Sequence, residues 1–103
     1  MTVYVDNLRI PARVGGIRGR WSHLTADTPA ELHEFAARLG LKRAWFQTCK
    51  TRCGPAGTSC VHWHYDVVST KRAEAIKLGA KAIDLYELGD ILAARHAAAG
   101  GAA

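Results

Sequence analysis

Histidine and aspartate side chains recur near the ends of the expected strands, where they could move protons or hold a metal ion. The candidates for catalysis are His23, Asp27, His64, Asp66 and Asp6. Histidine can act as acid or base because the unperturbed pKa of imidazole lies near neutrality. Asp6, Asp27 and Asp84 each end an expected strand, and Asp66 lies within another. Carboxylates that converge there would bind magnesium or manganese and activate water against a phosphodiester.

The same aspartates could instead have a purely structural role. An Asp at a strand end commonly caps a turn or the following helix by accepting backbone hydrogen bonds. A first strand that ends in Asp6 nevertheless resembles the layout of small metal-dependent nucleases related to the PIN domain. A metal-dependent nuclease and a set of structural caps therefore both stay open.

A second group of chemically reactive side chains lies between two expected strands, in a Cys/His-rich loop at about residues 48–63. It contains Cys49, Cys53, Cys60 and His62. These four side chains could hold structural zinc in a tetrahedron, and the glycines of the loop would permit a tight turn. Free thiols or a labile disulfide are the alternatives, since the spacing matches no standard zinc finger.

A third group suggests anion binding. Lys71 and Arg72 lie in the first turn of an expected helix, where positive charge opposes the helix dipole unless an anion binds there. The other candidate ligand-binding residues are His33, Gln47 and Tyr65. The alternative is a solvated helix start without a ligand.

Composition limits the class of protein. The chain has 103 residues, of which 49% are hydrophobic and 22% charged, values that fit one globular domain with its own core. The net charge of +5 favours an anionic small molecule or nucleic acid as partner. No apolar run approaches the length that spans a membrane, and Asp6 comes too early for a secretory signal, so we expect a cytoplasmic protein.

Local patterns predict alternating strands and helices. Strands are expected at residues 2–5, 21–26, 43–47, 64–68 and 80–84. Thr28, Pro29 and Glu31 form a capping box for a helix that ends at Gly40. Ser69 is expected to cap a helix that ends at Gly79, and residues 86–96 form the last helix. Residues 14–19 are expected to be a flexible loop, and residues 97–103 a flexible tail.

This order of elements predicts an α/β fold. Residues 1–96 would form a single domain with a small, mainly parallel or mixed sheet of four to five strands, flanked by about three helices.

Several motifs together resemble a known family. They are Tyr4-Val5-Asp6, Trp21-Ser22-His23-Leu24, Glu31-Leu32-His33, Trp45-Phe46-Gln47, His64-Tyr65-Asp66 and Lys71-Arg72. In this order they resemble domain of unknown function 4031, a family of small proteins from actinobacteria and their phages. The resemblance implies a shared fold and polar signature, but no activity. It also implies that the cysteine loop is an elaboration in which any zinc would be structural.

Whether the protein is an enzyme stays open at this point. The leading hypothesis is a polar His/Asp pocket that binds or acts on a phosphate-bearing ligand or nucleic acid, with His23 and His64 transferring protons. The alternatives are a non-catalytic zinc-binding interaction module built on the cysteine loop and the metal-dependent nuclease.

Overall fold

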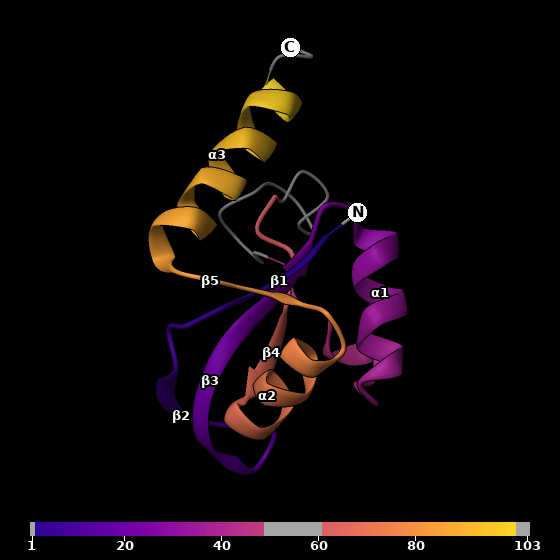
Figure 1. The fold of residues 1–103 in the computed structure, drawn as a ribbon, viewed down its shortest axis with the longest axis vertical. Coiled ribbons are helices and arrows are strands. Elements are labelled where there is room, and N and C mark those ends of the chain that lie inside the picture. The colour runs from indigo at the N-terminus through magenta and orange to yellow at the C-terminus, as the bar shows by residue number, and fades with distance from the viewer. Residues whose placement is uncertain (1, 49–60, 101–103) are drawn as a thin grey trace.

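The described part of the chain forms a mixed five-stranded sheet with three α-helices and one short 3₁₀ helix (Figure 1). The computed structural model describes residues 2–48 and 61–100. The strands are β1 (Val3–Asp6), β2 (Ile10–Val14), β3 (Ile17–Ala26), β4 (Tyr65–Val68) and β5 (Lys81–Ile83). The helices are α1 (Pro29–Arg38), the short 3₁₀ helix η1 (Arg43–Trp45), α2 (Ser69–Lys77) and α3 (Leu85–Gly100). The predicted α/β class, with a mixed sheet and about three helices, is confirmed.

The long strand β3 organises the sheet. Leu24 pairs with Val5 of β1 and with Tyr65 of β4, so these two strands lie on opposite edges of β3. Strand β2 pairs with the first half of β3, on the edge that β1 occupies further along. All three strands run antiparallel to β3, and only β5 lies parallel to its neighbour, β1. The sheet is therefore mixed rather than mainly parallel.

A bulge between β1 and β2 determines where Asp6 points. Residues 6–9 lie opposite residues 22–23 of β3, so the chain must leave the regular ladder there. Arg9 has a positive φ of 48°, and its amide donates to Ser22 Oγ at 3.3 Å. The bulge lets the Asp6 carboxylate accept hydrogen bonds from the amides of Leu8 and His23.

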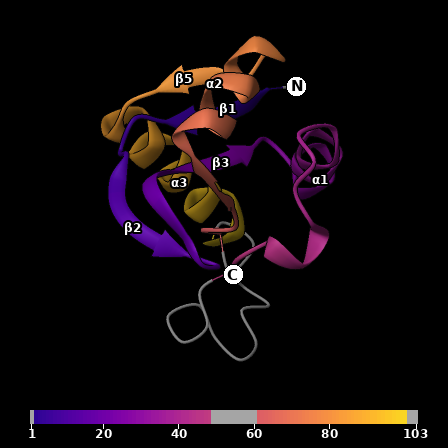
Figure 2. The same cartoon turned by 90° about the horizontal axis from the view of Figure 1, so that it is seen from below.

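The two faces of β3 have different roles. Ser22, Leu24 and Ala26 are buried, and Leu24 and Ala26 belong to the core together with Leu32 and Phe35 of α1. Successive side chains alternate between faces. His23 and Thr25 therefore face the other way, where Leu88 and Leu92 of α3 line a cavity with them. Figure 2 shows the curved β2–β3 hairpin and α1 at opposite sides of the molecule.

Helix α1 begins as its sequence predicts. Thr28 Oγ1 accepts from the Glu31 amide at 3.3 Å and donates to the Glu31 carboxylate at 3.0 Å, and Pro29 occupies the first turn. We expect Thr28→Ala to lower the free energy of unfolding by about 1 kcal/mol, because an orphan helix donor loses its acceptor. Urea denaturation checks this, with Thr28→Ser as the control that keeps the hydroxyl. Equal stability of the two variants would contradict it.

The predicted flexible loop at residues 14–19 is wrong. Val14 pairs with Ile17 across a hairpin whose two turn residues, Gly15 and Gly16, both have positive φ. Such a turn matches the right-handed twist of its strands, so β2 and β3 continue directly into it. Gly19 lies within β3, where an added Cβ would come within 2.7 Å of a Val68 methyl group.

Other predicted boundaries also need correction. The strand expected at residues 43–47 is the 3₁₀ helix η1 followed by one isolated bridge, Gln47 with His64. Ser69 is not a side-chain cap of α2, because its hydroxyl donates to the Arg20 carbonyl instead. Helix α3 extends to Gly100, beyond the expected end at residue 96.

Candidate functional site

A row of polar side chains crosses the sheet from β1 to β4. Asp6 ends β1, His23 lies in β3, and Asp66 lies directly opposite His23 on β4. His64 precedes Asp66 by two residues, so both point to the same face of the strand. Gln47 reaches the row through its backbone bridge with His64. Four separate parts of the chain thus meet at one place.

Asp6 and His23 form a buried hydrogen-bonded pair. The Asp6 side chain is fully buried, and its Oδ2 lies 2.6 Å from His23 Nδ1. Because a carboxylate only accepts, His23 must carry its hydrogen on Nδ1, which leaves the Nε2 lone pair available in the neutral ring. The bond to Asp6 raises the pKa of His23 above its usual range. Burial would raise the pKa of Asp6, but its hydrogen bonds from His23 and Leu8 hold it below its usual range.

The His64 ring, like that of His23, bonds an acceptor through Nδ1. Its Nδ1 lies 2.7 Å from the carbonyl oxygen of His62, which can only accept. The hydrogen is therefore on Nδ1 and the lone pair of the neutral ring is on Nε2. The rings of His23 and His64 meet edge to face, with centroids 4.8 Å apart.

Asp66 completes the cluster. Its Oδ1 lies 3.3 Å from His64 Nε2, and its Oδ2 accepts from Gln47 Nε2 at 2.5 Å. Burial would raise the pKa of Asp66, but hydrogen bonding to His64 and Gln47 lowers it below its usual range. When the His64 ring is neutral and carries its hydrogen on Nδ1, its Nε2 and the carboxylate oxygen are two acceptors that face each other. This contact is favourable only with a proton or a cation between them.

His23, His64 and Asp66 can hold a metal ion. One nitrogen or oxygen atom from each lies within 4.8 Å of the others. Two imidazoles and a carboxylate are a donor set that suits zinc or iron(II) and leaves coordination positions open. Ligands of one zinc ion lie about 3 to 3.5 Å apart, given bond lengths of about 2 Å, so a bound ion would draw the three groups closer together.

Each of these three side chains has a supporting partner. Asp6 supports His23, the His62 carbonyl supports His64, and Gln47 supports Asp66. Metal-binding histidines in proteins usually donate their second N–H to a carboxylate or carbonyl, which fixes the ring and its tautomer. The partner of His23 is a carboxylate and the partner of His64 is a carbonyl, so both are of these kinds. The arrangement thus fixes the positions and tautomers of both imidazoles, as metal binding would require.

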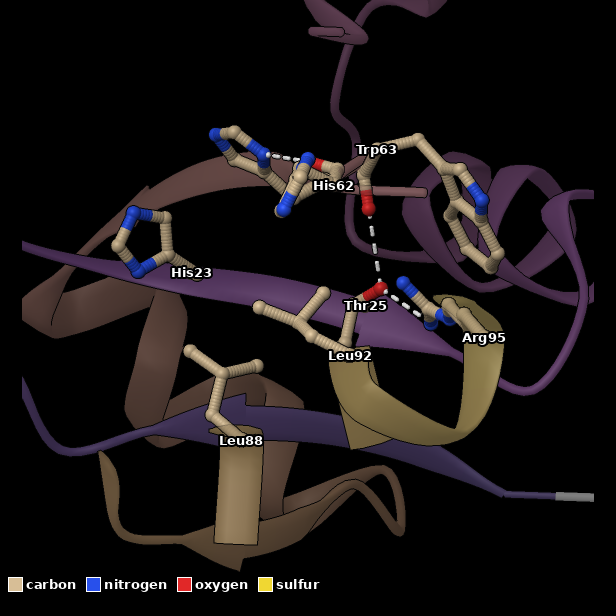
Figure 3. A pocket seen from close by; sticks show the side chains of 8 residues that line it. His23, Thr25, His62, Trp63, Leu88, Leu92 and Arg95 are labelled. Carbon is tan, nitrogen blue, oxygen red and sulfur yellow. Dashed lines mark hydrogen bonds between the residues drawn. The ribbon is translucent and has the colours of Figure 1, made fainter. Parts of the chain in front are cut away.

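A cavity of about 180 Å³ opens beside the two histidines (Figure 3). It is lined by His23, Thr25, His62, Trp63, His64, Leu88, Leu92 and Arg95. Arg95 closes one end: its guanidinium lies 3.7 Å from the centre of the Trp63 ring and donates to Thr25 Oγ1 at 2.9 Å. Leu88 and Leu92 of α3 face His23 across the space. The cavity can admit a small group but not a whole metabolite.

The comparisons with known proteins establish a family. The model described as "Protein of unknown function (DUF4031)" matches residues 3–95. The chain belongs to this family. No curated protein and no solved structure gives a match. The resemblance stated from the motifs is confirmed, and the DUF4031 match includes every residue of the His/Asp cluster.

The structure gives Asp27 and Asp84 other roles than the expected joint site with Asp6. Asp27 follows β3, which runs antiparallel to β1, so it lies beside Thr2 at the opposite end of β1 from Asp6. It accepts from the Thr2 amide and from the Tyr4 hydroxyl, which raises the pKa of Tyr4. Asp84 accepts from the Glu87 amide at the start of α3. The expectation of convergence is wrong for Asp27, which holds β1 instead of capping α1. Asp84 directly follows β5, the parallel neighbour of β1, and has the helix-capping role that was the alternative to catalysis.

The expected anion-binding residues make contacts within the protein. Arg72 Nε donates to the Asp6 carbonyl at 2.8 Å, which fixes the end of β1 behind the cluster. Lys71 Nζ donates to the Leu39 carbonyl and pairs with Glu74. His33 Nδ1 lies 2.9 Å from the hydroxyl of buried Tyr65, on the core side of β4. His33 and Tyr65 are thus placed away from the cluster, while Gln47 belongs to it.

The predicted zinc loop lies mostly outside the described residues. Cys49, Cys53 and Cys60 fall in the range 49–60, so that zinc site stays a prediction. His62 lines the small cavity, and its Nε2 lies 3.4 Å from His96 Nε2 of α3. Arg95 was not predicted as a cavity residue, although it follows Leu88 and Leu92 at helical spacing. Among the described residues, no helix is long and apolar enough to cross a membrane.

Proposed function

We propose that this DUF4031 protein binds a divalent transition-metal ion through His23, His64 and Asp66 and uses it to hydrolyse a phosphate-bearing substrate. The observation that carries the proposal is the set of three metal-binding side chains, each with a partner that fixes it. Three protein ligands are typical of catalytic zinc sites, which keep a position open for water, whereas structural sites use four.

The proposed reaction is metal-assisted hydrolysis. A metal ion in this site would lower the pKa of a bound water to about 7 and supply hydroxide as nucleophile. Hydroxide forms the new P–O bond, the ester P–O bond breaks, and the leaving oxygen takes a proton from solvent. The chain's own part is to hold the two imidazoles in the tautomer that presents Nε2. The net charge of +5 favours an anionic substrate over a neutral one.

Cobalt(II) binding tests the metal centre separately from the cysteine loop. Chelator-treated protein is titrated with cobalt(II) and its visible absorption is recorded. A His/His/Asp site gives d–d bands without thiolate charge-transfer absorption, whereas cysteine ligands add that absorption in the near ultraviolet. We expect the first spectrum from one ion per chain. If thiolate absorption alone develops, or no band does, the proposed centre is wrong.

Hydrolysis tests the reaction. The chelator-treated protein is supplied in turn with zinc, iron(II), manganese or magnesium and assayed on p-nitrophenyl phosphate and bis(p-nitrophenyl) phosphate. We expect turnover with zinc or another late transition metal rather than with magnesium, because imidazole ligands disfavour the hard cation. Turnover that needs no metal would contradict the proposed mechanism.

Asp6 is a positioning residue for this centre. In Asp6→Asn the amide nitrogen would face His23 Nδ1 and force the ring to accept there, which moves its hydrogen to the metal-binding Nε2. We expect cobalt(II) affinity to fall by about 10- to 100-fold, as for other lost supporting partners. Asp27→Asn is the matched control, because Asp27 lies at the other end of β1. Equal affinity of the two variants would show that Asp6 does not act through His23.

A further inference from the structure

We infer that the large cavity beside Asp66 binds a nucleotide, with its base against tryptophan and its phosphate at the metal centre. This inference rests on the proposed function, because it assigns the substrate class of that site. It depends on the size of the cavity, its walls and its connection to the His/Asp cluster.

The cavity has the size and position of a substrate site. Its volume is about 650 Å³, whereas the space beside the two histidines has about 180 Å³. Sites for small molecules and cofactors commonly measure roughly 300 to 1,000 Å³. Asp66 and Gln47 line the large cavity, and Asp66 also belongs to the metal cluster. His23 and His64 line the smaller space, so a ligand in the large cavity approaches the proposed metal ion from the side of Asp66.

The walls of the cavity are aromatic and apolar. Trp21 and Trp45 line it together with Val14 and Ile17 of the hairpin. Trp45 is 49% exposed and Ile17 52% exposed, so apolar surface is left open around the cavity. The Trp21 indole is fixed because its Nε1 donates to the Ala12 carbonyl at 3.1 Å. A base or another flat ring stacks well on such side chains, since every base has a π face.

The large cavity also has polar residues in its lining, one of them a cation. Lys71 and Thr70 line the cavity with Gln47 and Asp66. Lys71 Nζ makes bonds to the Leu39 carbonyl and to Glu74 among the described residues, and an ammonium has three N–H donors. One donor is thus left for a phosphate oxygen, and the two internal bonds hold the group in place. A metal ion at Asp66 would add positive charge to the same cavity.

Tryptophan fluorescence with adenosine 5′-monophosphate, adenosine and inorganic phosphate tests this assignment. Each is titrated into zinc-loaded protein, excited at the red edge of indole absorption. We expect the nucleotide to quench tryptophan fluorescence and to bind at least about tenfold more tightly than adenosine. Inorganic phosphate alone should not quench the fluorescence. Trp45→Ala should weaken nucleotide binding about tenfold or more. Tyr86→Ala is the matched control, because Tyr86 is an 86% exposed aromatic residue on α3.

The outcomes separate this inference from the metal proposal. In chelator-treated protein the difference in affinity between nucleotide and adenosine should become smaller, while adenosine still binds. Persistent adenosine binding supports the assignment of the cavity even if the metal proposal fails. Equal binding of nucleotide and adenosine in zinc-loaded protein would overturn the placement of the phosphate. No quenching by either, in protein shown to hold the metal, would overturn the inference and leave the metal centre standing.

Discussion

His64→Ala should weaken cobalt(II) or zinc binding by more than about 100-fold and abolish metal-dependent hydrolysis. The variant removes one of the three proposed metal ligands, a larger loss than that of a supporting partner, which costs about 10- to 100-fold. It also leaves the Asp66 carboxylate without the imidazole 3.3 Å away. Loss of the cobalt d–d bands measures the effect without the need for a known substrate.

His33→Asn is the matched control for this experiment. His33 is also a partly buried histidine, but its Nδ1 bonds the Tyr65 hydroxyl on the core side of β4. Asparagine can keep a polar group near that hydroxyl, and we expect unchanged metal affinity. Circular dichroism checks that both variants fold. If His64→Ala folds and binds cobalt as tightly as His33→Asn does, His64 is not a ligand.

Arg95→Ala should release helix α3 from the sheet and cost roughly 3 kcal/mol. The guanidinium stacks on Trp63 and donates to the Val61 carbonyl, Thr25 Oγ1 and the Ala26 carbonyl. A hydrogen bond to a charged group contributes about 1.5 to 3 kcal/mol, and a desolvated cation–π contact up to about 2. The individual values overlap, so the total is smaller than their sum.

Amide hydrogen exchange across residues 85–98 measures the release of α3. We expect exchange there to accelerate by about two orders of magnitude in Arg95→Ala, because 3 kcal/mol corresponds to about a hundredfold change in an opening equilibrium. Arg95→Lys should restore little of the protection from exchange, since an ammonium cannot reproduce the planar set of donors of the guanidinium. Arg38→Ala controls for loss of an exposed arginine. Unchanged exchange in Arg95→Ala would show that other contacts hold α3.

The local signals of the sequence predicted the helices better than the strands. Thr28, Pro29 and Glu31 specify the start of α1 through contacts within one turn, and the structure has them. The hairpin was missed because Gly15 and Gly16 were interpreted as flexibility. The same glycines supply the two positive φ values that a tight turn needs. The strand predicted at residues 43–47 was wrong because a short run of apolar side chains fits one helical turn as well as a strand.

The candidate site was predicted in its residues but not in its arrangement. Asp6, His23, His64 and Asp66 were all named from the sequence and come together. Asp27 and Asp84 were grouped with them on the assumption that strand ends meet at one edge. For Asp27 that assumption fails because β3 runs antiparallel to β1, and the direction of a strand depends on distant pairing that local patterns do not encode. Asp84 does follow a strand parallel to β1, but its carboxylate accepts from the Glu87 amide at the start of α3.

Arg95 was missed because its role depends on packing. Its spacing after Leu88 and Leu92 indicates the inner face of a helix, where an arginine is unusual. That signal marks it as a partly buried cation that needs acceptors. Burial lowers the pKa of Arg95 below its usual range. The identity of its acceptors depends on how α3 meets β3, which the sequence does not specify.

A crystal structure of the zinc-loaded protein, with anomalous diffraction recorded on both sides of the zinc absorption edge, tests the central claim most directly. We predict an anomalous peak bound by His23 Nε2, His64 Nε2 and an Asp66 carboxylate oxygen, with Asp6 still bonded to His23 Nδ1. Zinc found only at other side chains, with these three groups left as they are without metal, would contradict the claim.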